Sequence, residues 1–340
     1  MRLLAAMSGG VDSSVAAALL VEEGHEVVGV TLRLWDNPTD AGCCSVAEID
    51  DARSVANLLG IDHLVWTFVE EFDARVVAPY AAAHADGLTP NPCIECNRHL
   101  KFGRLLRRAG MLGFDAVATG HHARIVDDGG RRRLLRGADP LKDQSYVLYV
   151  LGQEELRRCR FPVGTMTKAG VRAKAAALGL PTADKPDSQD VCFVTTSGGR
   201  KALLSSRIPL HPGRVVDTAG ADVGKVDAME LVTVGQRRGL GTGGGAKRYA
   251  ISVDTSSRTV VVAEAGDLLA PSVELTQLSW VYEPVQGAVT VQTSAHGDPV
   301  GAIFTGATVR FAEPQRRVAP GQSVVLYRGD EVLGGGTATA

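Results

Sequence analysis

A glycine-rich loop between an apolar run and a helical pattern constrains the fold of this chain more than any other feature. The apolar run covers residues 3–7, residues 8–14 read SGGVDSS, and residues 11–23 place apolar side chains on one helical face. A helix N-terminus offers unpaired N–H groups and a dipole that attracts anions. Two glycines let a phosphate approach the backbone closely. The pattern therefore predicts a phosphate-binding loop between a buried strand and a helix.

Strand and helix patterns alternate up to about residue 200. Runs rich in β-branched or apolar residues lie at 26–35, 63–68 and 115–119, with helical patterns between them. Such alternation predicts an α/β domain in which a parallel sheet has helices on both faces. Residues 123–136 additionally predict a hairpin. We expect this α/β domain to cover residues 1–204.

In the remainder of the chain the long helical periodicity disappears. Short β runs punctuated by glycine and proline follow instead, for example at 214–217, 259–263 and 323–327. Several short strands with such punctuation are typical of small barrels or sandwiches. We therefore expect two small β-rich domains, a central one at 205–269 and a barrel-like C-terminal one at 270–340.

Charge and cysteine content exclude several classes of protein. The 36 Lys and Arg residues against 38 Asp and Glu give a net charge of −2, which excludes a uniformly basic nucleic-acid binder. Residues 98–136, with ten Lys or Arg and three Asp or Glu, are either a local basic face or an ordinary solvated surface. Six cysteines are too few for a disulfide-stapled secreted scaffold. No apolar run approaches the ~18 residues of a membrane span and no signal peptide is evident, so we expect a cytoplasmic protein without membrane association.

The loop at 8–14 lacks both the Gly-Lys-Ser/Thr of a Walker A loop and the G-x-G-x-x-G of dinucleotide folds. Asp12 would repel a phosphate unless Mg²⁺ bridged the two, so we assign it to metal or ligand orientation. The loop resembles the PP-loop of the ATP pyrophosphatases. This resemblance implies an adenine nucleotide alpha hydrolase-like fold that cuts ATP between its α and β phosphates and adenylates a substrate oxygen. Amide ligases and tRNA-modifying enzymes share such a loop, so the loop alone leaves the substrate open.

Three cysteines stand in a context that indicates chemistry. Cys93 and Cys96 form a C-x-x-C at the expected start of a helix, a position that lowers the pKa of a thiol. No second C-x-x-C or H-x-x-x-H exists in the sequence to complete a structural zinc site. Cys192 follows a basic segment at 168–185. The cysteines without such context, which we expect to be structural, are Cys43, Cys44 and Cys159.

Eight segments extend the resemblance to one family, the bacterial tRNA-specific 2-thiouridylases. They run through nearly the whole chain in family order, at 8–14, 51–61, 87–103, 118–124, 143–148, 161–193, 234–241 and 320–327. The resemblance implies that oxygen O2 of the wobble uridine in tRNA attacks the α-phosphate of ATP and pyrophosphate leaves. Sulfur then displaces AMP from C2. A PP-loop amide or nitrogen ligase and a non-catalytic tRNA-binding protein are the alternatives.

The same resemblance implies roles for particular residues. Cys192 would carry a persulfide supplied by a cysteine desulfurase or a persulfide relay protein, and Cys96 would attack it, so that the two end as a disulfide. The residues expected to line ATP are Ala6, Met7, Ser8, Gly9, Gly10, Val11, Asp12, Ser13, Leu32 and Gly120. Those expected to contact the target base or the tRNA are Asn91, Pro92, Cys93, His121, Asp143, Gln144, Ser145, Arg310, Phe311 and Gln322.

Cys93 occupies a place where some members of the family carry Asp. A thiol is a weaker base there unless it is activated, but it completes a set of three cysteines with Cys96 and Cys192. Related tRNA thiolases hold a [4Fe–4S] cluster with three cysteines. Persulfide relay and cluster chemistry are thus both open, and we favour the relay. The tRNA isoacceptors, the identity of the sulfur donor and the oligomeric state do not follow from the sequence.

Overall fold

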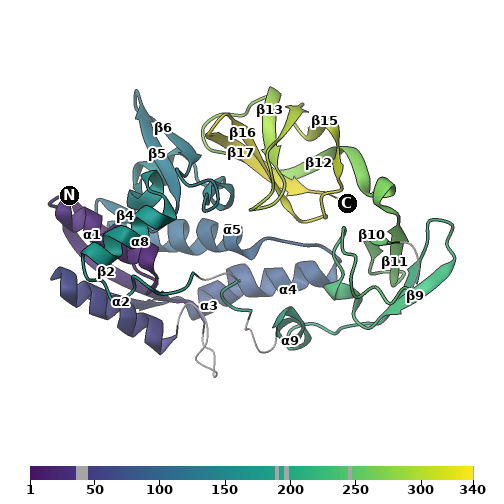
Figure 1. The fold of residues 1–340 in the computed structure, drawn as a ribbon, viewed down its shortest axis with the longest axis horizontal. Helices are drawn as coiled ribbons and strands as arrows, with labels where there is room; N and C mark the ends of the chain where they lie inside the picture. Colours follow the sequence, from purple (N-terminus) through teal and green to yellow (C-terminus); the bar gives the residue numbers. More distant parts are fainter. Residues whose placement is uncertain (36–44, 188–190, 195–198, 244–246, 340) are drawn as a thin grey trace.

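The chain folds into an N-terminal parallel sheet, a small central sheet and a C-terminal barrel (Figure 1). The computed structural model describes residues 1–35, 45–187, 191–194, 199–243 and 247–339. Cys43 and Cys44, which we expected to be structural, lie outside the described residues. No helix within these ranges is both long and apolar enough to cross a membrane.

The N-terminal sheet has five parallel strands in the order β3-β2-β1-β4-β7. Its central strand is β1, in which Leu3 pairs with Val27 of β2 on one side and with Ala116 of β4 on the other. The expected α/β architecture is confirmed, although the sequence did not predict the two-residue edge strand β7. The strands are β1 (Arg2–Ala6), β2 (Glu26–Arg33), β3 (His63–Thr67), β4 (Ala116–Ala118) and β7 (Cys159–Arg160).

Helices cover both faces of this sheet, because each face presents buried apolar side chains. One face packs on α1, α2 and α8 around Ala5 and Met7. The other packs on two helical runs that connect β3 to β4, around Leu4 and Val30. The first group is α1 (Val11–Glu22), α2 (Val46–Leu59) and α8 (Lys168–Ala177); the second is α3 (Val69–Phe72), η1 (Asp73–Val77) and α4 (Ala78–Ala85), then α5 (Pro92–Cys96), η2 (Asn97–Arg104) and α6 (Leu105–Met111).

The last of these runs begins at Pro92, so the C-x-x-C lies at the start of a helix, as expected. The Asn91 side chain accepts a hydrogen bond from the backbone N–H of Cys93 (3.0 Å), and Pro92 occupies the first helical position, where its missing N–H is not needed. The cap thereby places Cys93 in the first turn of the helix and Cys96 at the start of the second.

The central domain is a four-stranded sheet in the order β10-β11-β8-β9. It lies at the far end of α4, opposite the parallel sheet (Figure 1). Buried His84 of α4 donates a hydrogen bond from Nδ1 to the Glu230 carbonyl of η5 (3.2 Å), which joins the two domains. Its elements are α9 (Gly199–Ser205), β8 (Gly213–Val216), β9 (Asp222–Val226), η5 (Met229–Leu231), β10 (Tyr249–Asp254) and β11 (Thr259–Ala263).

The C-terminal domain is a closed six-stranded barrel, because β12 pairs with both β15 and β17. The expected barrel-like domain is thus confirmed. Phe304, Val309 and Leu326 lie in its core. Its elements are η6 (Ala265–Leu268), β12 (Leu269–Trp280), β13 (Gly287–Gln292), β14 (Val300–Phe304), β15 (Thr308–Arg316), β16 (Ser323–Arg328) and β17 (Glu331–Ala338).

The predicted hairpin forms, and it extends the barrel sheet instead of standing alone. β5 (Ala123–Asp128) pairs with β6 (Arg131–Arg136), and β6 pairs with β17. Buried Glu331 accepts hydrogen bonds from Arg131 and Arg133 at this junction. The remaining short helices, which lie between the hairpin and α8 in the chain, are η3 (Ser145–Leu148), α7 (Gln153–Arg157) and η4 (Pro162–Thr165).

Candidate active site

The glycine-rich loop connects β1 to α1, as the sequence predicted. Ser13 and Ser14 fold their hydroxyl groups back onto the Gly10 carbonyl (3.0 and 2.9 Å), and the Ser8 N–H donates to Ser13 Oγ (3.2 Å). These bonds hold the loop in shape without consuming the N–H groups of the first turn of α1, which have no partner inside the helix. The loop therefore presents donors to an anion.

Two glycines allow this loop to fit its surroundings. Gly9 has a φ of +74°, and a side-chain carbon there would lie 2.4 Å from the Glu48 carbonyl oxygen of α2. A side-chain carbon at Gly120, just after β4, would lie 2.6 Å from the Ser13 nitrogen. Both positions therefore require glycine. Gly120, predicted as an ATP residue, supports the loop backbone directly.

Asp12 is held by two residues that the sequence reasoning missed. Its carboxylate accepts hydrogen bonds from His122 Nε2 (3.0 Å) and from Lys168 Nζ (2.9 and 2.7 Å). Burial opposes ionisation, but these bonds outweigh it and hold the pKa of Asp12 below its usual value. Asp12 is thus a carboxylate, the form that Mg²⁺ binds. The only sequence signal for His122 was its place beside His121.

A second ionic cluster ties the chain leading to Cys192 to the loop. Asp187 accepts from Lys142, Lys168 and Arg172 at 2.7 to 2.8 Å. Burial alone would raise its pKa, but the Lys142 and Lys168 bonds lower that pKa to about 2. Lys185 bonds the Gly9 carbonyl (3.0 Å) and Asp51 of α2 (2.6 Å). Residues 183–187 are therefore fastened to the loop and to α8.

The two cysteines of the C-x-x-C have different environments. Cys93 is exposed, and Cys96 is buried in the apolar cluster between the helices and the sheet. Desolvation by the surrounding protein raises the pKa of the Cys93 thiol, and the charge of Lys101 offsets only part of this effect. The expectation that the helix start lowers the pKa is thus wrong for Cys93, because desolvation of its thiol outweighs the charge of Lys101.

Cys192 packs against the same apolar cluster that contains Cys96, and its thiol is free. The next residue, Phe193, places its ring on Tyr80 (5.6 Å between centroids) and on Phe72 (5.5 Å). Burial raises the pKa of Tyr80, and the nearby Cys93 thiol adds to this shift. The fold therefore brings the segment of Cys192 to the helices that carry the C-x-x-C.

The three thiols Cys93, Cys96 and Cys192 are all described, and they do not form a group placed to hold a metal ion. The arrangement therefore does not fit a preformed cluster site. Cys159 is different from these three. It is buried in β7, and burial raises the pKa of its thiol well above the usual value.

Most of the predicted tRNA residues in the middle of the chain lie inside the molecule. His121 is buried between Phe102 and Phe161, and desolvation lowers its pKa well below the usual value. Asp143 bonds Arg136 (2.9 Å) and the Ser145 hydroxyl (2.8 Å). Gln144 is exposed and accepts from the His122 N–H (2.9 Å). Among the four predicted residues of this region, only Gln144 offers an open side chain.

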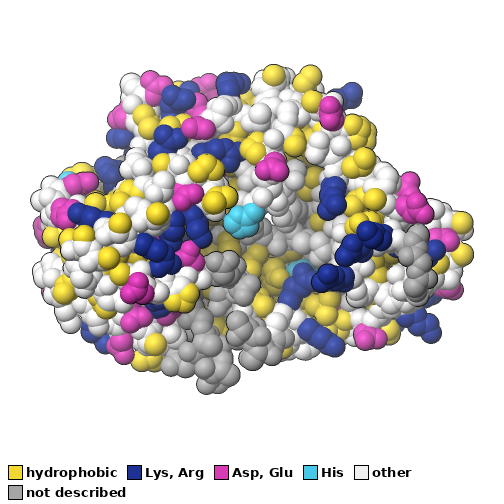
Figure 2. Space-filling model, viewed as in Figure 1, with side chains coloured by type: hydrophobic (Ala, Val, Ile, Leu, Met, Phe, Trp, Pro, Cys, Tyr) yellow, Lys and Arg dark blue, Asp and Glu magenta, His cyan; other side chains and the backbone are white. Residues whose placement is uncertain are grey.

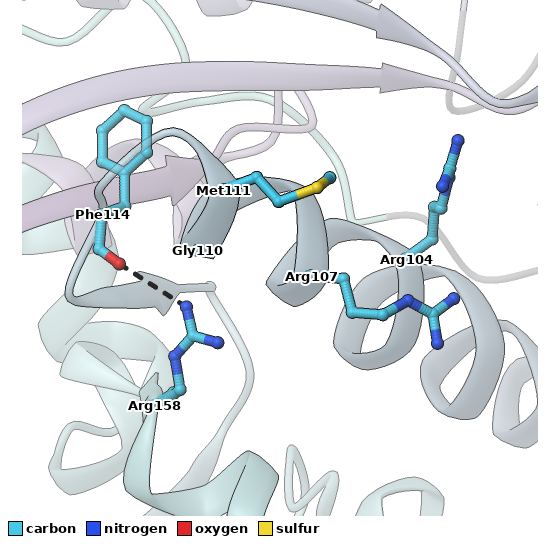
Figure 3. A pocket seen from close by; sticks show the side chains of 6 residues that line it. All are labelled: Arg104, Arg107, Gly110, Met111, Phe114 and Arg158. Atoms are coloured by element: carbon cyan, nitrogen blue, oxygen red, sulfur yellow. Dashed lines mark hydrogen bonds between the residues drawn. The ribbon is translucent and has the colours of Figure 1, made fainter.

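An open hollow of about 750 Å³ lies apart from these residues, at the C-terminal end of α6 (Figure 3). Arg158 reaches the Phe114 carbonyl across it (3.5 Å). Part of the basic run at 98–136 thus faces this hollow. Its lining residues are Arg104, Arg107, Gly110, Met111, Phe114 and Arg158.

Comparison with known proteins identifies the family. The tRNA methyl transferase HUP domain family matches residues 1–196, its PRC-barrel domain matches 201–264, and the aminomethyltransferase beta-barrel domain matches 272–338. The tRNA-specific 2-thiouridylase MnmA of Chloroflexus aurantiacus is 47% identical over 98% of this chain and 97% of its own. The MnmA of Mycolicibacterium paratuberculosis is 47% identical over 99% and 98%. The chain belongs to the tRNA-specific 2-thiouridylase (MnmA) family.

A solved U34-tRNA thiolase, NcsA from Methanococcus maripaludis with its [4Fe-4S] cluster, is a far more distant neighbour. It is 17% identical, covers 61% of this chain and 63% of its own, and has a TM-score of 0.38. A likeness this low says nothing about the thiols of the present 2-thiouridylase.

The residues expected of a 2-thiouridylase fall into two groups in space. The nucleotide residues from Ala6 to Ser13 form the end of β1, the loop and the start of α1, with Gly120 against them. The tRNA residues of the barrel are dispersed: Arg310 is exposed, Gln322 is half-buried and Phe311 lies in the barrel core. Figure 2 shows a hollow bordered by the parallel-sheet domain, the barrel and the central domain, with Lys and Arg side chains to its left and right.

Proposed function

We infer that this member of the MnmA family is an ATP-dependent tRNA sulfurtransferase that makes 2-thiouridine at the wobble position. The single observation that carries this conclusion is the loop that presents N–H donors beside Asp12, in a chain that matches MnmA proteins over nearly its full length. The amide ligase and the non-catalytic binding protein have no comparable support. We further propose the division into units 1–204, 205–269 and 270–340.

Adenylation is the task of the loop. The N–H groups at the start of α1 bind the phosphates of ATP, with Leu32 and Gly120 bordering the nucleotide. Asp12, an ionised carboxylate, is the loop residue suited to hold Mg²⁺, which neutralises phosphate charge when bound. The uridine O2 bonds to the α-phosphorus, and the bond from that phosphorus to pyrophosphate breaks. C2 then carries AMP, a far better leaving group than an oxide.

Sulfur transfer is the task of Cys96 and Cys192. A cysteine desulfurase or a persulfide relay protein loads a sulfur onto Cys192. The terminal sulfur of this persulfide attacks C2 and AMP leaves with the original O2. Thiolate from Cys96 then attacks the Cys192 sulfur, which breaks the S–S bond to the uridine sulfur and leaves a Cys96–Cys192 disulfide. An external dithiol reductant restores both thiols. No step runs through an iron–sulfur cluster, because Cys93, Cys96 and Cys192 are not arranged to hold one.

The tRNA binds in the hollow of Figure 2, where Lys and Arg side chains attract its phosphates. The target base leaves the stack and enters beside Asn91, Pro92 and Cys93, since the reacting C2 is otherwise inside the anticodon loop. Gln144 and Arg310 are exposed and available to contact the tRNA directly. The buried residues His121, Ser145 and Phe311 and the half-buried Asp143 support those surfaces from within.

An anaerobic thiolation assay tests this function. Protein, unmodified tRNA, Mg-ATP and a cysteine desulfurase are combined, 2-thiouridine is read by mass spectrometry, and iron is quantified. We expect product without iron, lost in Cys96→Ser and Cys192→Ser and retained in Cys93→Ser. If activity requires iron and all three cysteines, the persulfide relay is wrong and a cluster mechanism takes its place. Pyrophosphate release without any thiouridine overturns the tRNA assignment and favours a ligase.

A further inference from the structure

Lys168 directs all three of its N–H donors to two aspartates. Its Nζ lies 2.9 and 2.7 Å from the two carboxylate oxygens of Asp12 and 2.8 Å from Oδ1 of Asp187. An ammonium group has three donors and no acceptor, so each donor of Lys168 has one carboxylate oxygen as its partner. Only 12% of the Lys168 side chain is exposed. The residue thus joins the phosphate loop to the chain that leads to Cys192.

Asp187 stands five positions before Cys192 in the chain. Arg172 of α8 donates to the Ala183 carbonyl (2.8 Å), to the Lys185 carbonyl (3.0 Å) and to Asp187 itself (2.8 Å). Lys142 adds a further bond to Asp187 (2.7 Å). These bonds hold the Asp187 carboxylate between Arg172 and Lys142.

Binding of ATP with Mg²⁺ competes with the bonds between Lys168 and Asp12. The triphosphate brings several negative charges to the loop beside Asp12, and Mg²⁺ requires the carboxylate oxygens that Lys168 now occupies. The Asp187 carboxylate instead bonds Lys142, Lys168 and Arg172, which lie outside the loop, so the nucleotide does not compete for these bonds.

We propose that Lys168 exchanges Asp12 for the β and γ phosphates of ATP, and that Asp187 is a positioning residue that passes this change to the segment of Cys192. In the adenylation step, Lys168 donates hydrogen bonds to the oxygens of the departing pyrophosphate, which takes the electron pair of the broken P–O bond. Charge on this leaving group increases in the transition state, so a fixed ammonium lowers the barrier. Release of pyrophosphate returns Lys168 to Asp12.

Two readouts separate the roles. Pyrophosphate is measured as a single-turnover burst with tRNA and Mg-ATP but without a sulfur donor, and 2-thiouridine is measured with the donor present. Lys168→Ala should raise the KM for ATP and slow the burst on the order of 10²-fold, as expected for one lost charge-assisted contact to the leaving group. Lys168→Arg should restore part of both. The matched control is Lys174→Ala, because Lys174 also links α8 to α1, through an ion pair with Glu22 (2.7 Å) on an exposed surface. This variant should release pyrophosphate at the wild-type rate.

Asp187→Asn keeps the shape of the side chain but removes its charge. We expect its burst to stay within about threefold of wild type while the thiouridine formed per pyrophosphate falls at least about tenfold. Equal losses in both readouts would reduce Asp187 to a structural anchor. An unchanged KM for ATP in Lys168→Ala would make Lys168 a counterion of Asp12 only.

The sulfur-transfer half of this inference rests on the proposed function, and the two can fail separately. Wild-type protein that releases pyrophosphate but makes no 2-thiouridine contradicts the proposed function. Wild-type protein that makes 2-thiouridine while Lys168→Ala and Asp187→Asn match it contradicts this inference and leaves the proposed function standing.

Discussion

Replacing Gly120 by alanine tests whether the phosphate loop depends on the close approach of β4. The added carbon would lie 2.6 Å from the Ser13 nitrogen and 2.7 Å from the Asp12 carbonyl carbon, whereas ordinary contacts begin near 3.4 Å. The obstacle is backbone, which cannot rotate away, so the loop must shift by roughly 0.8 Å. Such overpacking costs about 1–3 kcal/mol of stability.

The effect on catalysis should exceed the effect on stability. A displacement near 1 Å in the groups that position a substrate can cost on the order of 10²-fold in rate. We therefore expect kcat/KM for ATP in pyrophosphate release to fall by roughly that factor in Gly120→Ala, while circular dichroism still reports a folded chain. The matched control is Gly266→Ala, where an added carbon meets nothing within 4 Å. A Gly120→Ala protein with kcat/KM within threefold of wild type would refute the claim that Gly120 fixes the loop.

Two further predictions concern other parts of the chain. Burial, with a contribution from Arg200, lowers the pKa of His84 to about 4, although the hydrogen bond to the Glu230 carbonyl opposes this shift. Below pH 6.5 the unfolded state therefore binds a proton that the folded state does not. The free energy of unfolding, measured with urea, should fall between pH 6.5 and 4, by about 1 kcal/mol at pH 5.5. His84→Asn, whose amide can still donate to Glu230, should flatten this profile, and an unchanged slope would exclude His84 as its source. Glu331→Gln should destabilise the chain by about 1.5–3 kcal/mol, because it weakens two charge-assisted hydrogen bonds at a buried junction. The control is Asp330→Asn, which removes the exposed ion pair with Arg124 and should cost under about 1 kcal/mol. Equal losses of unfolding free energy in urea would contradict this account of the junction.

The sequence predicted the elements whose signals are local. Apolar runs predicted β1 to β4, and the glycines, serines and Asp12 predicted the loop after β1. The strand β7 was missed because two residues, Cys159 and Arg160, are too few to show a period. The sequence placed a helix start near the C-x-x-C, and the Asn91 cap with Pro92 at the first helical position sets that start in the structure.

The interactions missed by the sequence reasoning join residues far apart in the chain. Asp12 and Lys168 are separated by 156 positions, and Arg133 and Glu331 by 198. No periodicity or spacing relates such partners, since only the folded sheet and barrel bring them together. The pKa of Cys93 was predicted in the wrong direction for a similar reason: its helix position is visible in the sequence, but the tertiary packing that desolvates its thiol is not.

The relay of sulfur between Cys192 and Cys96 is the central claim, and one measurement tests it most directly. Enzyme with a persulfide on Cys192 is mixed anaerobically with tRNA and Mg-ATP for a single turnover without reductant, and its peptides are mapped by mass spectrometry. The account predicts a Cys96–Cys192 disulfide in an amount equal to the 2-thiouridine formed, with Cys93 still a thiol. Formation of 2-thiouridine while Cys96 and Cys192 both remain thiols, or a disulfide that contains Cys93, would contradict it.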